Sequence, residues 1–362
     1  MRLAELGWDD ARAREFAEWA GQPGIEPARV AIEFNHIFRV LGEHDDLDVT
    51  TSGRLKHQVG SRSGLPAVGD WVVVRRRPGG TSGDIVAVLP RRSWFSRKTA
   101  GEVTDEQVVA ANVDVVFVVM GLDGDYNLRR LERYLLLARE SGARPVVLLT
   151  KADLATSRET VLDEVVRVAP GVPVHAISPR LASQLPEVQQ YLRPGLTAAL
   201  LGSSGVGKST IINKLAGDAL QRTREVRASD SRGRHTTTHR ELVVLPDGGL
   251  IIDTPGMREL QLWDVGEAVK ETFDEIEALA SECRFSDCRH RDEPRCAVKA
   301  AVEAGTIGAD RLQSYHKLQE ELDVLARRQD ARALIDEKRR SKVMHKALKA
   351  HLKTKQIGRA HV

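Results

Sequence analysis

The stretch Leu201-Gly202-Ser203-Ser204-Gly205-Val206-Gly207-Lys208-Ser209 decides how this chain folds. It fits the pattern G-x-x-x-x-G-K-[ST], which is that of the phosphate loop of nucleoside triphosphatases. The apolar run Leu196 to Leu201 predicts a buried strand before the loop, and Thr210 to Leu215 predicts the start of a helix after it. Strand, glycine loop and helix are the context that the motif needs, so we expect an α/β domain built around this loop.

The chemistry of the loop follows from its residue types. Glycines let backbone N–H groups close on phosphate oxygens at the positive end of a helix dipole. We expect Lys208 to neutralise the β- and γ-phosphates and the Ser209 hydroxyl to ligate Mg²⁺. The expected nucleotide-binding residues here are Leu201, Gly202, Ser203, Ser204, Gly205, Val206, Gly207, Lys208 and Ser209.

A second motif, Thr150-Lys151-Ala152-Asp153, follows the predicted strand Val146–Leu149. It resembles the N/T-K-x-D element with which GTPases read guanine. The Asp153 carboxylate would accept hydrogen bonds from N1–H and the N2 amino group of guanine, and adenine would leave it unpaired, which is costly. We expect Thr150, Lys151, Ala152 and Asp153 to bind the base. Ser178, after the predicted strand Val172–Ile177, fits a third base-contacting loop.

The two switch elements come later in the chain. Leu250 to Ile252 leads into Asp253-Thr254-Pro255-Gly256, a D-x-x-G element, where Asp253 would hold Mg²⁺ through water and the Gly256 N–H would sense the γ-phosphate. The run Gly233 to Thr238 is the expected first switch, in which Thr236, Thr237 or Thr238 would cap Mg²⁺. Because the base-reading loops precede the phosphate loop, we interpret the domain as a circular permutant.

Residues 112–194 alternate predicted strands and helices, which favours a parallel sheet with helices on both faces. Before them, five short β-like runs in about sixty residues predict a small barrel, of which the oligonucleotide-binding fold is one type. The runs are Arg29–Phe34, Ile37–Leu41, Leu47–Thr51, Asp70–Arg75 and Asp84–Leu89. Basic residues are plentiful here and aromatic ones are sparse, which favours phosphate contact over base stacking. These basic residues are Arg54, Lys56, Arg62, Arg75, Arg76, Arg77, Arg91, Arg92, Arg97 and Lys98.

All three cysteines of the chain lie in one short stretch with the spacing Cys283-x4-Cys288-x-His290-x5-Cys296. Three thiolates and one imidazole form a complete tetrahedral ligand set, so we expect one structural zinc ion. Clustered cysteines do not resemble a disulfide framework and indicate a reducing cytoplasm.

Helical spacing returns at Ala309–Arg328, and residues 338–355 carry basic side chains without an acidic one. A run of one sign in a nucleotide-binding protein favours RNA as a partner. The last six residues, 357–362, match what a sequencing-library adapter would encode, and we leave them out of the fold prediction.

Composition is that of an ordinary soluble protein. The 362 residues carry a formal charge of +3, and 29% of them are charged. Residues 1–20 contain no apolar signal segment, and no apolar run approaches the ~20 residues of a membrane span.

Together these motifs resemble one family, the RsgA (YjeQ) GTPases of small ribosomal subunit maturation. Gly69-Asp70-Trp71-Val72, the segment Gln107–Asp114, Gly233–Thr238 and the Cys/His spacing all look like that family. The resemblance implies GTP hydrolysis stimulated by the small subunit, late-stage assembly, and contacts of the barrel and zinc domain with 16S ribosomal RNA. It also implies a catalytic role for His235, since Met257 stands where Ras-type enzymes have a water-orienting glutamine.

The expected fold is multi-domain α/β, with GTP or GDP, Mg²⁺ and Zn²⁺ bound and the chain a cytoplasmic monomer. We expect an N-terminal segment at 1–27, an oligonucleotide-binding-type barrel at 28–98, a circularly permuted GTPase domain at 99–270, a zinc-knuckle helical domain with a basic tail at 271–356, and a tail that we interpret as non-native at 357–362. Three alternatives stay open: a permuted GTPase of the large subunit, a phosphate-loop ATPase or kinase, and an RNA-binding scaffold with a relic nucleotide site.

Overall fold

The structure is a computed structural model of the whole chain. It describes residues 3–34, 36–80, 82–98, 106–155, 157–178, 186–217, 240–253 and 272–320. These residues fall into two compact units, the first made of residues 1–99 and 105–272 and the second of residues 100–104 and 273–362. The first unit holds the barrel and the nucleotide-binding motifs, and the second holds the cysteine cluster.

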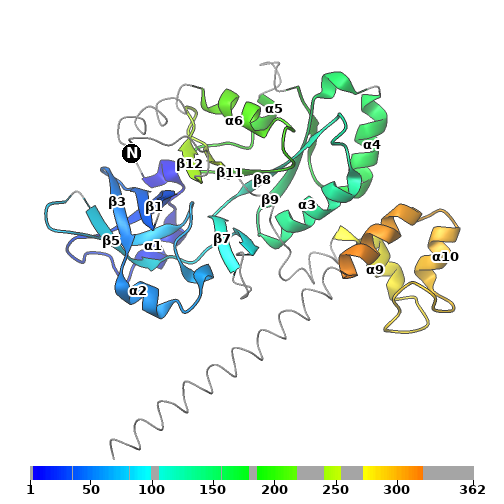
Figure 1. Cartoon of the computed structure of the whole chain (residues 1–362), viewed down its shortest axis with the longest axis horizontal. Coiled ribbons are helices and arrows are strands. Elements are labelled where there is room, and N and C mark those ends of the chain that lie inside the picture. The colour runs from blue at the N-terminus through cyan, green and yellow to red at the C-terminus, as the bar shows by residue number, and fades with distance from the viewer. Residues whose placement is uncertain are drawn as a thin grey trace, which may run out of the picture. The chain divides into compact units, whose positions relative to one another are not determined.

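A closed five-stranded barrel opens the first unit (Figure 1). Its strands are β1 (Ile25–Phe34), β2 (Ile37–Leu41), β3 (Asp46–Thr51), β4 (Trp71–Arg76) and β5 (Ser82–Val88). The strand order is β1-β2-β3-β5-β4, and β4 returns to pair with β1. Alternate side chains such as Val30, Val40 and Val72 point inward and form its core. The predicted oligonucleotide-binding-type barrel is confirmed.

A mostly parallel sheet follows, in the order β10-β9-β8-β11-β13-β12. Its strands are β8 (Val115–Gly121), β9 (Arg144–Thr150), β10 (Val174–Ala176), β11 (Thr197–Leu201), β12 (Glu241–Val244) and β13 (Leu250–Asp253). The first five in space run parallel and β12 runs antiparallel to β13. β8 and β11 are fully buried and, apart from Thr197, carry no polar side chain, as strands covered on both faces require.

Helices cover both faces of this sheet (Figure 1). α3 (Leu128–Glu140) packs on β8 and β9, and α4 (Arg158–Val168) packs on β10. α5 (Pro186–Gln189) and α6 (Lys208–Ala216) share a core with the opposite sheet face, which includes Phe117 and Leu200. The expected doubly covered sheet is therefore confirmed, and its base-reading strands precede the phosphate loop in the chain.

One backbone pairing joins the barrel to the sheet. β1 of the barrel pairs antiparallel with β12, where Ile32 lies opposite Glu241. A separate hairpin of β6 (Trp94–Lys98) and β7 (Glu106–Ala111) links the barrel to β8 along the chain. The remaining elements of this unit are η1 (Leu3–Leu6), α1 (Asp10–Phe16), α2 (Gly53–Gln58), η2 (Arg62–Gly64) and η3 (Ala152–Leu154).

The second unit is helical. It contains α9 (Asp274–Ala280), α10 (Ala297–Glu303) and a helix over 309–320, with the cysteine-rich loop between α9 and α10. Phe273, Ile276, Val298 and Tyr315 are buried in it. The predicted helix Ala309–Arg328 agrees with the structure up to residue 320, and the basic run 338–355 and the residues 357–362 lie outside the described residues.

Candidate functional site

The phosphate loop connects the buried strand β11 to α6, as the sequence predicted. Gly202 needs to be glycine because a Cβ there would lie 2.2 Å from the carbonyl oxygen of Val119. Gly207 caps α6 with a φ of 103°, a left-handed conformation that favours glycine. The Lys208 amine donates to the carbonyl oxygens of Gly202, at 2.7 Å, and Ser203. Backbone donors and a lysine ammonium therefore converge at the start of α6, as an anion site requires.

Thr150 connects the base-reading motif to this loop. Its side chain is fully buried, and its hydroxyl oxygen lies 2.5 Å from the carbonyl oxygen of Val206 and 3.3 Å from that of Met120. Val206 belongs to the phosphate loop and Met120 to β8. Two loops that are far apart in sequence are thus held in one fixed arrangement by a threonine hydroxyl.

Lys151 and Asp153 follow the carboxyl end of β9. Lys151 has a φ of 56°, and its ammonium forms an ion pair with Asp123, the residue two positions after β8 ends. The hydrogen bond from Lys151 holds the pKa of Asp123 below its usual value. Asp153 is exposed in η3, Ala152 is half-buried beside it, and Ser178 is buried two residues after β10.

Of the remaining predicted nucleotide-site residues, two lie in the described part of the chain and the others lie outside it. Ser209 is exposed in the first turn of α6, and Asp253 is the last residue of β13, the strand next to β11. Both therefore lie at the carboxyl edge of the sheet with the phosphate loop. His235, Thr236, Thr237, Thr238, Gly256 and Met257 lie outside the described residues.

The four predicted zinc ligands come together in the second unit. The potential ligand atoms of Cys283, Cys288, His290 and Cys296 all lie within 4.8 Å of one another. The Cys283 and Cys296 sulfurs are 3.9 Å apart, and His290 Nδ1 lies 3.6 Å and 3.4 Å from them. A tetrahedral centre with Zn–S bonds of about 2.3 Å separates its sulfurs by about 3.8 Å. These residues therefore form a cluster that can hold a metal ion, and its geometry fits a closed tetrahedral site.

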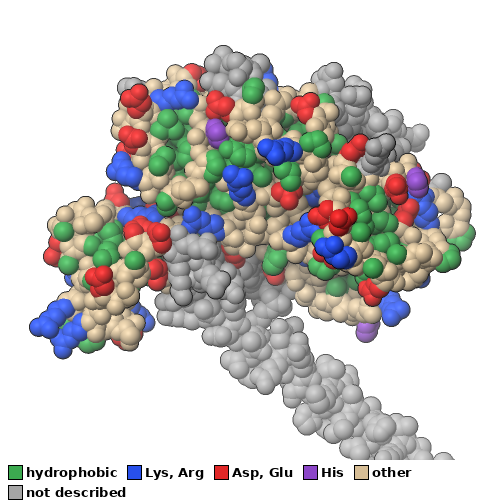
Figure 2. Space-filling view, turned by 180° about the vertical axis from the view of Figure 1, so that it is seen from behind, with side chains coloured by type: hydrophobic (Ala, Val, Ile, Leu, Met, Phe, Trp, Pro, Cys, Tyr) green, Lys and Arg blue, Asp and Glu red, His purple; other side chains and the backbone are tan. Residues whose placement is uncertain are grey.

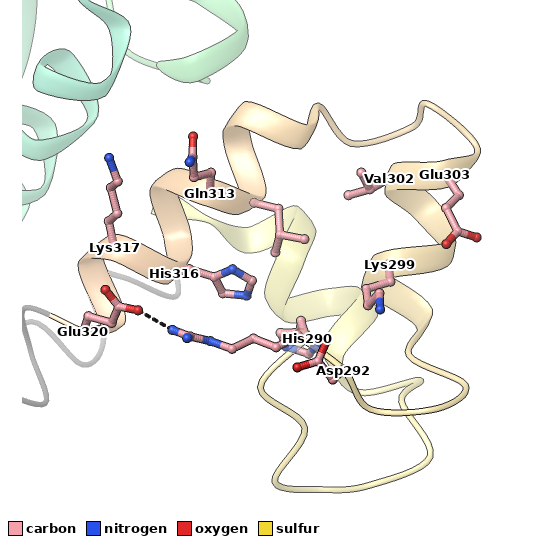
Figure 3. Close-up of a pocket in the computed structure, with 11 residues that line it drawn as sticks. His290, Asp292, Lys299, Val302, Glu303, Gln313, His316, Lys317 and Glu320 are labelled. Atoms are coloured by element: carbon pink, nitrogen blue, oxygen red, sulfur yellow. Dashed lines mark hydrogen bonds and ion pairs between the residues drawn. The ribbon is translucent and has the colours of Figure 1, made fainter.

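A cavity of about 550 Å³ lies between this cluster and the helix over 309–320 (Figure 3). Arg291 reaches across it to Glu320, with 2.5 Å between Nη2 and Oε1. Its charged lining is balanced, since Arg291, Lys299 and Lys317 face Asp292, Glu303 and Glu320. The cavity therefore has no excess of charge that would favour an anion or a cation.

Ion pairs change the expected electrostatics of the barrel. Four of the ten basic residues that the sequence singles out are matched with carboxylates: Arg76 with Glu26 and Asp45, Arg77 with Asp84, Arg91 with Asp70, and Arg92 with Asp9. Acidic and basic side chains are intermingled over the face shown in Figure 2. Arg54, Lys56 and Arg62 are exposed on and just after α2. These three residues, here called the α2 cluster, are the better candidates for phosphate contact.

Sequence reasoning missed Asp123 as a neighbour of the base-reading lysine. A signal was present: Gly121-Leu122-Asp123 follows a buried strand that is parallel and adjacent to β9. Adjacent parallel strands end at the same edge, so a charged residue just after one can reach a residue just after the other.

Comparison with known proteins agrees with this architecture. The family model described as RsgA GTPase matches residues 88–263. A small ribosomal subunit biogenesis GTPase RsgA of Opitutus terrae is 50% identical over 91% of this chain and 92% of its own length. Another protein of that name, from Syntrophotalea carbinolica, is 40% identical over 95% of this chain and 96% of its own length.

Two solved structures resemble the structure of this chain. YjeQ from Thermotoga maritima gives a TM-score of 0.62 at 27% identity, covering 82% of this chain and 98% of that one. YloQ, described as a circularly permuted GTPase, gives 0.59 at 23% identity, covering 85% and 98%. The fold, the loops at one sheet edge and the full-length relatives agree: this chain belongs to the RsgA GTPase family, whose members hydrolyse GTP.

Proposed function

We propose that this enzyme is a maturation factor of the small ribosomal subunit, which binds the subunit and hydrolyses GTP when bound. The names of relatives that match over nine-tenths of the chain support this partner. The contact between Thr150 and Val206 supports GTP as the nucleotide, because it joins a guanine-reading motif to a phosphate loop. The phosphate-loop ATPase alternative lacks any such use for the Thr150–Asp153 motif.

Each site residue has a proposed role. Asp153 selects guanine by accepting from its N1–H and N2 amino group, and Lys151, held by Asp123, covers the ring. The residues Ala152 and Ser178 line the base, residues 201–209 hold the phosphates, and Gly256 senses the γ-phosphate. Magnesium bound by Ser209, and by Asp253 through water, would neutralise phosphate charge. His235 orients or deprotonates the attacking water, and one of Thr236, Thr237 and Thr238 caps the metal.

We propose zinc as the metal of the Cys283, Cys288, His290 and Cys296 cluster. Three sulfurs and one imidazole nitrogen suit zinc and leave no open position for water, which is typical of a structural site. We retain the domain boundaries expected from sequence, together with a monomeric state and a cytoplasmic location, as parts of this proposal. Among the described residues, no helix is long and apolar enough to cross a membrane.

Contact with 16S ribosomal RNA is the second half of the function. The α2 cluster is exposed, whereas Arg76 and Arg77 already face carboxylates. A lysine or arginine that replaces counterions on RNA phosphates makes binding salt-dependent, and one that is neutralised by an acid contributes little to that dependence. The α2 cluster is therefore the proposed phosphate-contacting part of the barrel.

The test measures binding to purified small and large subunits over a range of salt concentrations, with a non-hydrolysable GTP analogue bound. We expect tight binding to the small subunit alone and a steep loss of affinity with salt. The triple variant Arg54→Gln, Lys56→Gln, Arg62→Gln should lower the slope of log K against log salt by about 2 to 3. The matched variant Arg77→Gln should leave the slope nearly unchanged.

Other results would favour another function. Preferential binding to the large subunit would support the large-subunit GTPase instead. Binding that ignores the bound nucleotide, together with no phosphate release, would support the RNA-binding scaffold.

A further inference from the structure

A second cavity, of about 500 Å³, lies at the edge of the sheet opposite the nucleotide loops. Asp114, Arg144 and Leu196 line it, and each immediately precedes or begins one of the adjacent parallel strands β8, β9 and β11. Ligands of open α/β sheets bind at the carboxyl ends of strands, so this amino-end cavity has no part in the nucleotide site. Parts of α1, β1 and β4 complete its wall, which makes it a pocket between barrel and sheet.

The cavity is rich in guanidinium groups. Four arginines line it, Arg12, Arg29, Arg92 and Arg144, against two carboxylates, Asp9 and Asp114. Asp9 is already engaged by Arg92 in two hydrogen bonds of 2.6 Å and 2.7 Å. The lining therefore carries an excess of positive charge, unlike the balanced cavity of Figure 3.

Two of these cations are buried. Arg29 is 2% exposed, and it donates hydrogen bonds to the carbonyl oxygens of Gly69, Leu6 and Asn112. Arg12 is also 2% exposed; it donates to the Asn112 side chain at 2.6 Å and is paired with the Glu15 carboxylate at 2.6 Å. The carbonyl partners of Arg29 satisfy its hydrogen bonds without neutralising its charge, and burying an uncompensated charge is costly. Burial correspondingly lowers the pKa of Arg29 to about 10.

Aromatic rings form another part of the wall. Trp8 and Trp71 both line the cavity, with their ring centroids 4.8 Å apart. Small-molecule sites are commonly cavities of about 300 to 1,000 Å³ at domain boundaries that combine apolar walls with a few convergent polar groups. Guanidinium groups match phosphate oxygens in geometry as well as in charge.

We propose that this cavity binds a small phosphate-bearing organic molecule, with the phosphate among the arginines and the organic part against Trp8. Such a ligand would supply the negative charge that the lining lacks. The site is separate from the GTP site, since the two lie at opposite ends of β8, β9 and β11.

The test uses the full chain saturated with GDP and Mg²⁺, so that the phosphate loop is filled. Inorganic phosphate and ribose 5-phosphate are titrated while tryptophan fluorescence is followed, with ribose as the matched uncharged control. We expect a saturable change for a phosphate-bearing probe, with Kd below about 1 mM, and none for ribose. The change should disappear in Trp8→Phe, which locates it.

Arg144→Gln supplies the charge test, because Arg144 is exposed and its removal should not unfold the chain. Affinity should fall about tenfold or more, as expected when one charge-assisted contact is lost. Arg167→Gln, an exposed arginine of α4 outside the cavity, is the matched control and should bind as wild type. If Arg144→Gln does not fold, Arg92→Gln replaces it. No saturable response to either phosphate probe, or equal affinity in the arginine variant, would overturn the proposal.

Discussion

Thr150 and Asp153 have separate roles in the guanine recognition that we propose. The buried Thr150 hydroxyl fixes the base-reading loop on the phosphate loop, while Asp153 stays exposed at the end of β9. A carboxylate held at a fixed distance from the phosphates can select a purine by its hydrogen-bonding edge. Selection then depends on what Asp153 accepts, since an unmatched polar group costs about 1–3 kcal/mol or more when buried by the base.

Replacing Asp153 by asparagine should therefore exchange the preferred base. In Asp153→Asn the amide can donate where the carboxylate accepted, so we expect weaker binding of GDP and stronger binding of xanthosine diphosphate. The expected reversal is about tenfold or more in each affinity, measured by competition for one fluorescent nucleotide. Asp163→Asn, an exposed residue of α4, is the control. A variant that still prefers GDP would show that the base is read elsewhere.

The cysteine-rich loop is an element whose fold we expect to depend on a bound metal ion. It carries two left-handed residues, His290 and Arg295, and Cys296 both belongs to the cluster and caps α10 by accepting from the Lys299 N–H at 3.4 Å. A loop held by four ligands and few apolar contacts gains much of its folding free energy from the ion.

We expect one zinc ion per chain in protein purified without chelator, measured by elemental analysis. Cys296→Ser should lose the ion and lower the unfolding temperature of the second unit, because both the cluster and the α10 cap are altered. Ser281→Ala, at an exposed position just after α9, should keep the ion. Wild-type protein without zinc would contradict the assignment.

The pairing of β1 with β12 joins the barrel, for which we propose RNA contact, to the strand that follows the proposed first switch in the chain. Beside it, Arg240 Nη1 lies 3.7 Å from Glu33 Oε2, and both side chains are largely buried, at 12% and 25% exposed. Burial lowers the pKa of Arg240, and the nearby Glu33 opposes that shift. Asp253 lies directly opposite Glu241 on β13, so one ladder runs from the barrel to the proposed magnesium ligand.

This ladder should transmit subunit binding to the nucleotide site. Glu33→Gln should reduce subunit-stimulated hydrolysis by about fivefold, equivalent to about 1 kcal/mol of coupling, and leave GTP affinity unchanged. The charge-exchanged double variant Glu33→Arg, Arg240→Glu should recover part of the lost rate, measured in the same assay. Stimulation that is unaffected in Glu33→Gln would remove the ion pair from the coupling.

Strands and motif loops could be predicted from sequence because the period of apolar residues, the spacing of glycines and the turn residues all depend on local structure. The turn residues Pro246–Gly249, for example, connect β12 to β13, and the Leu245 N–H donates to the Gly249 carbonyl oxygen at 2.7 Å. The cluster around Asn112 could not be predicted, because Arg12, Arg29 and Asn112 are brought together only by tertiary packing. For the same reason the ion pairs of Arg76 and Arg77 could not be predicted, since their partners Asp45 and Asp84 are brought to them by the folding of the barrel.

At the scale of the whole molecule, permutation determines how the parts are connected. The barrel precedes the base-reading strands, and the strand carrying Asp253 leads toward the metal-binding unit. The barrel therefore precedes the nucleotide-binding motifs in the chain, and the unit with the cysteine cluster follows them. This arrangement suits an enzyme whose chemistry is switched by a large partner, because ordering of the switch loops can depend on that partner.

The central claim is that the small subunit activates GTP hydrolysis by this chain. The most direct measurement is single-turnover hydrolysis of bound GTP, alone and with saturating small or large subunits, with His235→Ala in parallel. The account predicts a large increase with small subunits only, and a loss of about 10²-fold of that increase in His235→Ala while GTP affinity is retained. Equal rates with and without small subunits would contradict the account.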